Sequence, residues 1–153
     1  GRIFGDLKER FPRTAFAQQG GLAAAKVQFE KAQADAAKAS LTWVATSAGE
    51  DEYRTVARLR LAGLLLESKQ FDEALKQLTE ATAPGFESLV ADRRGDVLMA
   101  QGKKDEARAA YQSAWTAMDD KLDYRRLVEA KLTSLAAAPK AATASAAASG
   151  AKP

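Results

Sequence analysis

The chain has 153 residues, of which 46% are hydrophobic, 28% are charged and 7% are aromatic, and this composition excludes a chain that is disordered throughout. It contains neither His nor Cys, so the imidazole and thiolate groups on which most transition-metal sites and many covalent enzymes depend are missing. Alanine is abundant and there are only four prolines, which predicts an all-α fold.

Most of the formal net charge of +3 comes from the last seventeen residues, which hold Lys140 and Lys152 and no acid. The rest of the chain has the other 21 of its 23 basic residues and all 20 acidic ones, and the two signs alternate, as in "DDKLDYRR". A nucleic-acid binder presents a basic patch or stripe. We therefore expect no nucleic-acid partner.

At the start of the chain, a short helix and turn are expected over residues 1–12, because the residue before Pro12 disfavours the helical conformation. A repeat domain is expected over residues 13–136. Residues 137–153 contain no large apolar side chain, which predicts a disordered tail. No apolar run approaches the length of a membrane span, but the chain opens with Gly1 rather than Met. We expect it to be a fragment from which a membrane anchor is missing.

A phrase recurs three times along the middle of the chain: "QADAAKASL" at 33–41, "QFDEALKQL" at 70–78 and "KKDEARAAY" at 103–111. Its aspartates, Asp35, Asp72 and Asp105, are separated by 37 and then 33 residues. A period in the thirties is typical of stacked helical hairpins of the tetratricopeptide type. We predict about three hairpins, with each aspartate in the first turn of a second helix, where the helix dipole favours a carboxylate.

Within each predicted hairpin, small residues recur where the two helices would cross. They are Ala25, Ala62 and Gly95 on the first helices and Ala37, Ala74 and Ala107 on the second. Large residues four positions later are expected to fill the space between hairpins: Leu41, Leu78 and Tyr111. Gly102 is expected to end the first helix of the third hairpin as its C-terminal cap.

Two further features bound the array. Gly20 and Gly21 lie inside the first predicted helix, and they indicate either close packing against the N-terminal helix or a break in the first hairpin. After the third hairpin, "DYRRLVEAKLTSL" predicts a capping helix that covers the last repeat. Its apolar face is expected to carry Leu127, Val128, Leu132 and Leu135.

Nothing in the chain indicates catalysis. The acidic clusters "GEDE" and "MDD" offer oxygen ligands for a cation, but both fall at expected helix boundaries, where acidic residues commonly cap helices. "QGGL" at 19–22 fits no phosphate-binding loop. We expect no cofactor, no metal site and no enzymatic activity.

Helical-repeat arrays bind partners on a concave surface lined by their first helices. Seven large apolar residues fall at the inward-facing positions, together with two aspartates of the third hairpin. We predict a partner-binding groove. It is either open to a partner or already filled by the N-terminal helix, the terminal helix or a tight superhelical turn. The inward positions are Gln19, Leu22, Lys26 and Phe29, then Val56, Leu59, Gly63 and Leu66, then Leu89, Asp92, Asp96 and Met99. A clamp for a C-terminal carboxylate would need Lys, Arg and Asn on the inner face. Those positions hold leucines, Gly63 and the aspartates instead, so no such clamp is expected.

The strings "ARLRLAGLLLESKQFDEALKQL" and "RRGDVLMAQGKKDEARAAYQSAW", with "LTWV" closing the first hairpin, resemble the periplasmic domain of the YfgM family over roughly residues 3–135. Members are described as inner-membrane proteins with one membrane span and a periplasmic tetratricopeptide-like domain. The resemblance implies an ancillary subunit of the Sec translocon, located on the periplasmic side of the bacterial inner membrane and associated with the periplasmic chaperone PpiD. It also implies negative regulation of an Rcs-type envelope stress response.

Two hypotheses follow. The first is a non-enzymatic interaction module that holds translocon subunits, a periplasmic chaperone or translocating chains against the apolar groove residues. The second is a regulator that sequesters an envelope stress-signalling protein through a polar surface around Asp92, Arg93, Arg94 and Asp96. High salt would weaken the second kind of association much more than the first.

Overall fold

The structure, a computed structural model, describes residues 15–30 and 33–135, with side chains in the first helix described from 18 to 27. Over these ranges the chain forms seven helices and no strand, which confirms the all-α prediction. They are α2 (Ala15–Glu30), α3 (Ala34–Ser47), α4 (Asp51–Glu67), α5 (Phe71–Thr79), α6 (Glu87–Ala100), α7 (Lys104–Ala117) and α8 (Asp123–Ser134). The helix expected over residues 1–12 and the tail expected over 137–153 lie outside the described residues.

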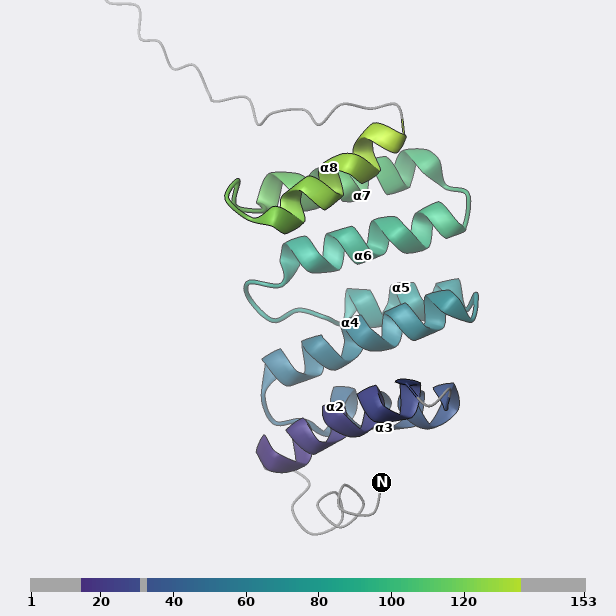
Figure 1. Ribbon diagram of the computed structural model, residues 1–153, viewed down its shortest axis with the longest axis vertical. Coiled ribbons are helices and arrows are strands. Elements are labelled where there is room, and N and C mark those ends of the chain that lie inside the picture. The colour runs from purple at the N-terminus through teal and green to yellow at the C-terminus, as the bar shows by residue number, and fades with distance from the viewer. Residues whose placement is uncertain (1–14, 31–32, 136–153) are drawn as a thin grey trace, which may run out of the picture.

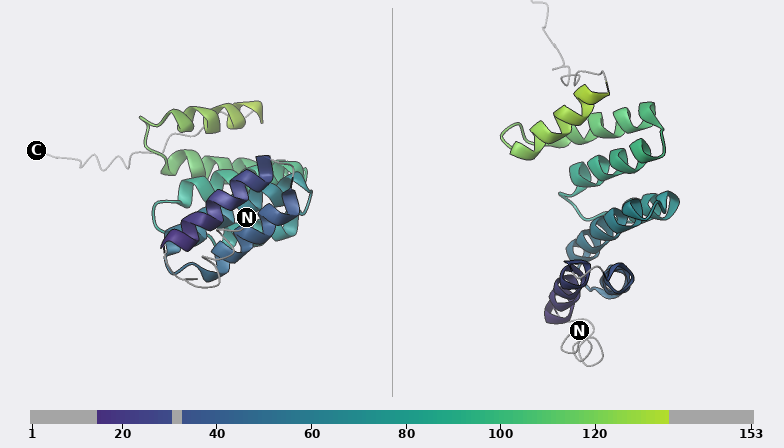
Figure 2. Two further views of the ribbon diagram at one scale, coloured as in Figure 1. Left: turned by 60° about the horizontal axis from the view of Figure 1, so that its bottom comes forward. Right: turned by 45° about the vertical axis from the view of Figure 1, so that its right-hand side comes forward.

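Three antiparallel helical hairpins, α2/α3, α4/α5 and α6/α7, stack along the long axis of the molecule, and α8 packs on the last of them (Figure 1). The first helices contact one another in series, α2 against α4 and α4 against α6. Figure 2 shows the same stack from two further directions, with α8 at the end opposite α2. The array expected from the repeated phrase is therefore confirmed.

Each second helix begins where the sequence predicts. The first turns of α3, α5 and α7 contain Asp35, Asp72 and Asp105, respectively. A carboxylate at this position is stabilised by the helix dipole and by the free backbone N–H groups of the first turn. The recurring phrase thus marks the start of the second helix in all three hairpins.

The two helices of each hairpin approach closely because the crossing residues are small. Ala37, Ala74 and Ala107 are completely buried on the second helices. Ala25 and Ala62 are buried at the matching positions of the first two hairpins, and Gly95 takes this place in the third. Short interhelical distances let each hairpin bury its apolar face against its neighbour.

The turns of the second and third hairpins have the same backbone geometry. Gly102 has a φ of 78°, and Lys69 at the equivalent place has a φ of 57°. In each turn the next residue donates its N–H back across the helix end, from Gln70 to the Leu65 carbonyl at 2.8 Å and from Lys103 to the Leu98 carbonyl at 2.9 Å. This is the Schellman pattern of helix termination, and it confirms Gly102 as a C-terminal cap.

The first helix, α2, runs without interruption through Gly20 and Gly21, so the glycine pair does not break the first hairpin. At the other end, α8 is held by Val128, Leu132 and Leu135, which are buried as predicted. Leu127 differs from the prediction, since it is 50% exposed. It lies next to Val128 in the helix, about 100° further round, and so points away from α7.

Two clusters of buried residues form the core. The first joins the α2/α3 and α4/α5 hairpins and extends to Val97 of α6. The second joins α6, α7 and α8, and Leu75 packs against both. The stack is therefore one continuous apolar interior, as expected for a repeat array in which each unit buries its faces against its neighbours.

Gly95 and Tyr111 are fitted to each other in the third hairpin. A Cβ atom added to Gly95 would lie 2.4 Å from Cε1 of Tyr111, far inside van der Waals contact. The Tyr111 ring thus lies on the backbone of α6 in its own hairpin, and its hydroxyl donates to Oδ1 of Asp96 at 2.8 Å. This corrects the expectation that Tyr111 fills the space between hairpins.

We predict opposite effects for alanine at Gly95 and at Gly63. Gly95→Ala should lower the free energy of unfolding by about 1–3 kcal/mol, because the new methyl group overpacks the Tyr111 contact. Gly63→Ala should raise it by about 1 kcal/mol, because a Cβ there meets no atom within 4 Å and alanine favours the helix. Urea unfolding followed by circular dichroism measures both. Equal effects at the two glycines would contradict the Gly95–Tyr111 fit.

Candidate protein-binding cleft

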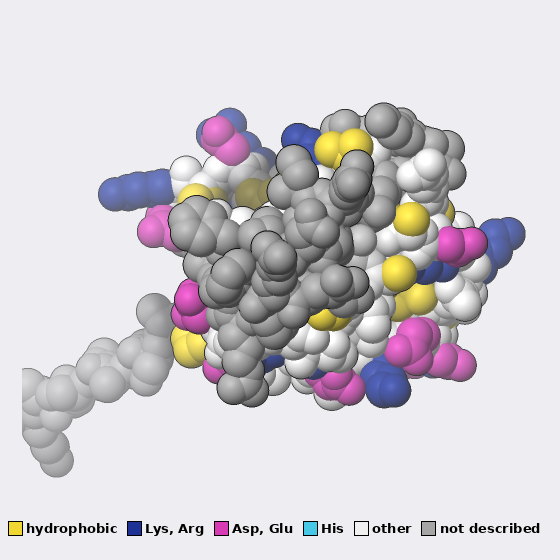
Figure 3. Space-filling view, turned by 90° about the horizontal axis from the view of Figure 1, so that it is seen from below, with side chains coloured by type: hydrophobic (Ala, Val, Ile, Leu, Met, Phe, Trp, Pro, Cys, Tyr) yellow, Lys and Arg dark blue, Asp and Glu magenta, His cyan; other side chains and the backbone are white. Residues whose placement is uncertain are grey.

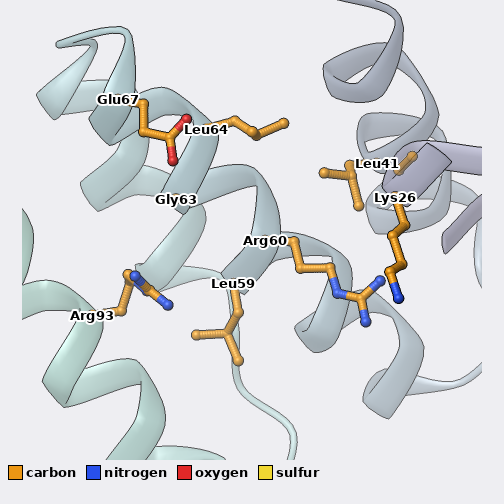
Figure 4. Close-up of a pocket in the computed structure, with 9 residues that line it drawn as sticks. Lys26, Leu41, Leu59, Arg60, Gly63, Leu64, Glu67 and Arg93 are labelled. Atoms are coloured by element: carbon orange, nitrogen blue, oxygen red, sulfur yellow. The ribbon is translucent and has the colours of Figure 1, made fainter. Parts of the chain in front are cut away.

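An open cleft of about 290 Å³ lies along the first helices of the array (Figure 4). This volume is near the lower limit of about 300–1,000 Å³ for small-molecule pockets, so the cleft accommodates a few side chains rather than a folded surface. Its lining comes from α2, α3, α4 and α6. The lining residues are Ala25, Lys26, Leu41, Leu59, Arg60, Gly63, Leu64, Glu67 and Arg93.

One face of α4 forms the centre of the cleft. Its residues 59, 60, 63, 64 and 67 form two adjacent pairs and a last residue that recur at intervals of three or four positions, which places them on one face of a helix. The predicted inward face of α4 was 56, 59, 63 and 66. The observed face shares Leu59 and Gly63 with it but is rotated about the helix axis, toward Arg60 and Leu64.

The floor of the cleft is apolar. Leu59 and Leu64 are half-buried and pack against the first core cluster, and Leu41 and Ala25 behind them are buried. Gly63 has open space where a side chain would stand. A partner's apolar side chain placed over Gly63 would be removed from water without displacing any side chain of the chain itself.

The rim of the cleft is mainly cationic, with Lys26, Arg60 and Arg93 against the single acid Glu67. Arg93 forms a long ion pair, with 3.7 Å between its guanidinium nitrogen and Oδ2 of Asp96. Among the described residues, neither Lys26 nor Arg60 makes an ion pair. Figure 4 shows their side chains extended toward the same end of the cleft, with Arg93 on the other side of α4.

The predicted groove residues do not all meet in this cleft. Of the six apolar ones whose side chains are described, only Leu59 lines it. Leu22 and Leu66 pack against the first core cluster and Met99 against the second, and Val56 is half-buried. Leu89 is 37% exposed on α6, and the Phe29 side chain lies outside the described side chains. Much of the predicted apolar surface is thus used inside the fold.

The two predicted aspartates have internal partners. Asp92 is 1% exposed, with Oδ1 accepting from Nζ of Lys131 at 2.8 Å and Oδ2 accepting from the Tyr124 hydroxyl. Asp96 accepts from the same Lys131 nitrogen at 2.8 Å and from Tyr111. These contacts join α6 to α8. Asp92 is therefore not available to a partner in this structure, and it holds the capping helix in place.

Burial and the two carboxylates also affect the tyrosines of this network. Burial raises the pKa of Tyr111 above its usual range, and the hydrogen bond to Asp96 raises it further. The pKa of Tyr124 is raised in the same way, by burial and by its hydrogen bond to Asp92. Both hydroxyls stay protonated as donors, because an anionic phenolate beside a carboxylate would be repelled.

The basic rim is the feature that sequence reasoning missed. Arg60 follows Leu59 directly, so counting helical positions places it outside the inward face, but its long side chain reaches the cleft. Lys26 was among the inward positions without a role assigned to it. The signal in the sequence that could have revealed the basic rim is the presence of long basic side chains beside an apolar stripe of a helix.

The described residues contain neither a cluster of metal ligands nor a helix that could span a membrane. Within residues 15–30 and 33–135, no group of three or more acidic, His or Cys side chains is placed to hold a metal ion. No helix in the described part has the length and apolar character needed to cross a bilayer. Seen from the α2 end, the described acidic and basic side chains are interspersed around the surface (Figure 3). This mixed pattern differs from the single-sign surface typical of nucleic-acid binders.

Comparisons with known proteins agree with this fold. A family model described as a tetratricopeptide repeat-like domain matches residues 1–137. The ancillary SecYEG translocon subunit of Neisseria gonorrhoeae is 33% identical over 129 residues, covering 84% of this chain and 62% of that protein. The protein of the same name from Escherichia coli is 33% identical over 84 residues, covering 55% of this chain and 41% of that protein. The chain thus spans less than two thirds of these relatives. No solved structure matches it significantly.

We predict that Lys131→Met lowers the free energy of unfolding by about 3 kcal/mol, because the buried Asp92 carboxylate loses its counter-charge. Chemical denaturation measures the change. Lys121→Met, at an exposed position, is the matched control and should change stability by less than about 0.5 kcal/mol. Adding Asp92→Asn to Lys131→Met should restore part of the loss. If Lys131→Met behaves like the control, the network does not hold α8.

Stability should fall in alkaline solution through the same network. Because the folded pKa values of Tyr111 and Tyr124 lie above the unfolded value of about 10, the stabilisation they provide is complete below pH 10 and is lost as pH rises further. Tyr124→Phe should make the free energy of unfolding fall less steeply between pH 9 and pH 11, the range around the pKa of an unfolded tyrosine. Denaturation at a series of pH values tests this, and identical slopes for the two proteins would contradict it.

Proposed function

Because the chain belongs to the tetratricopeptide repeat-like domain family, we propose that it is a non-enzymatic module that binds protein partners, with the cleft over α4 as its binding surface. The observation that carries this proposal is the open space over Gly63, with an apolar floor beneath it and a mainly basic rim, of which Lys26 and Arg60 make no ion pair with any described residue. Such a surface suits a short segment of another protein.

The relatives named ancillary SecYEG translocon subunits supply the setting of the proposal. We propose that this chain likewise works at the translocon of the bacterial inner membrane, on the periplasmic side. Translocon subunits, a periplasmic chaperone and translocating chains are the proposed partners. The sequence resemblance to the YfgM family supports the chaperone and the periplasmic location.

Among the groove residues expected from sequence, Leu59 has the strongest case as a partner contact, because it lines the cleft directly. Leu89 offers an exposed apolar side chain on α6. Leu22, Val56, Leu66 and Met99 offer only the part of each side chain that the core leaves exposed. Burying one apolar anchor of a partner is worth roughly 1.5–3 kcal/mol before the costs of association are subtracted.

Regulation of an envelope stress-signalling protein remains the alternative hypothesis from the resemblance. It relied on a polar surface around Asp92, Arg93, Arg94 and Asp96. In this region Asp92 and Asp96 are engaged by Lys131, and Arg94 donates to the Thr79 hydroxyl at 3.3 Å. These contacts leave fewer free polar groups for a partner, so we favour the cleft.

The decisive test fills the cleft without disturbing the core. Gly63→Leu places a helix-favouring apolar side chain in space that is otherwise open, so the variant should fold and should lose partner binding. A photoreactive residue in place of Glu67, which lines the cleft and leaves the basic rim intact, then reports contact with purified SecYEG in nanodiscs. We expect crosslinks from position 67 when Gly63 is kept and a loss of at least tenfold in Gly63→Leu, equivalent to about 1.4 kcal/mol.

A photoreactive residue at position 126, on the exposed surface of α8, is the matched control and should give little crosslinking. The same pair of positions can be tested with the purified periplasmic chaperone. Equal crosslinking from positions 67 and 126, unaffected by Gly63→Leu, would show that the cleft is not the binding surface.

A further inference from the structure

We infer that the cleft selects a partner segment in which acidic side chains stand on both sides of a short apolar stretch. This inference rests on the proposed function and specifies the chemistry of the partner. It comes from the distribution of charge around the cleft, where three basic side chains and one acidic side chain surround an apolar floor.

The basic groups lie at two separate ends. Lys26 belongs to α2 and Arg60 extends toward it from α4, whereas Arg93 belongs to α6 (Figure 4). Because α4 lies between α2 and α6, the apolar floor around Leu59 and Gly63 separates the two ends. One carboxylate cannot occupy both ends at once, so side-chain carboxylates on either side of an apolar residue fit better than a single chain terminus.

The α2 end favours an anion most strongly. Two cations that share one end of a cleft repel each other, and an anion between them converts that repulsion into attraction. Basic residues elsewhere in the array have acidic partners, including Arg58 with Glu80 and Arg108 with Asp105. Among the described residues, Lys26 and Arg60 have none, so a partner's carboxylate would supply a counter-charge that the described side chains do not.

Glu67 does not satisfy this end of the cleft. It is the last residue of α4 and lies two helical turns beyond Arg60. It makes no ion pair with any described residue. Figure 4 shows it beside Leu64 and Gly63, away from the ends of the Lys26 and Arg60 side chains. Its negative charge also disfavours an acidic group at that edge, which helps to fix the orientation of a bound segment.

The test uses three fluorescein-labelled 12-residue peptides with the same two leucines and an amidated C-terminus. They differ only in the residues that flank the leucines. The acidic peptide has Asp and Glu there, the neutral peptide has Asn and Gln, and the basic peptide has Lys. A fourth peptide has the neutral flanks and a free C-terminal carboxylate. Binding to the full 153-residue chain is measured by fluorescence anisotropy at 50 mM and 300 mM salt.

We expect the acidic peptide to bind about tenfold or more tightly than the neutral one, with the difference reduced at 300 mM salt. Arg60→Glu should weaken the acidic peptide about tenfold. Arg126→Glu makes the same change in net charge at an exposed position on α8 and should have little effect. Circular dichroism verifies that both variants are folded.

The outcomes separate the inference from the proposed function. If neutral, basic and acidic peptides bind equally well and Gly63→Leu blocks them all, the cleft is the binding surface and the acidic preference is wrong. Binding of only the free-carboxylate peptide would overturn the two-sided arrangement. If Gly63→Leu leaves the binding of every peptide unchanged, or if no peptide binds the parent chain, the inference fails. Crosslinking to SecYEG from position 67, which keeps Arg60, then decides the proposed function independently.

Discussion

The close approach of two helices at a small residue is the constraint on which the whole array depends. In each hairpin a fully buried alanine of the second helix is matched by a buried small residue of the first, which is Ala25, Ala62 or Gly95. Only then do the larger neighbours reach the next hairpin and form one continuous core. The first helices consequently lie in series, and the cleft over α4 exists because α2 and α6 flank that helix on both sides.

The elements of the fold follow from local sequence to a large extent. Asp35, Asp72 and Asp105 predict three helix starts because a carboxylate in the first turn is a local effect of the helix dipole. Gly102 predicts a helix end because a positive φ favours glycine. The equivalent turn at Lys69 has no such signal, since lysine occupies the left-handed conformation only when the surrounding structure requires it.

The cleft was less predictable, because its character depends on which groups find partners elsewhere. Repeat geometry indicated the first helices that line the cleft, with Lys26, Leu59 and Gly63 among their inward positions, yet it treated all inward positions alike. The local sequence gives no sign that Asp92 is buried, because its partners Lys131 and Tyr124 lie more than thirty positions further along the chain. Arg60 appeared to lie outside the groove because periodicity describes the direction of Cβ and not the reach of a long side chain.

The fit of Gly95 to Tyr111 has a consequence for how this sequence evolves. The tyrosine ring occupies the volume that any side chain at position 95 would need, so neither position changes freely while the other stays as it is. A methyl group at position 95 is destabilising unless the residue at position 111 becomes smaller, and a smaller residue there loses the hydroxyl that donates to Asp96. The packing of one hairpin and the attachment of the final helix are thereby inherited together.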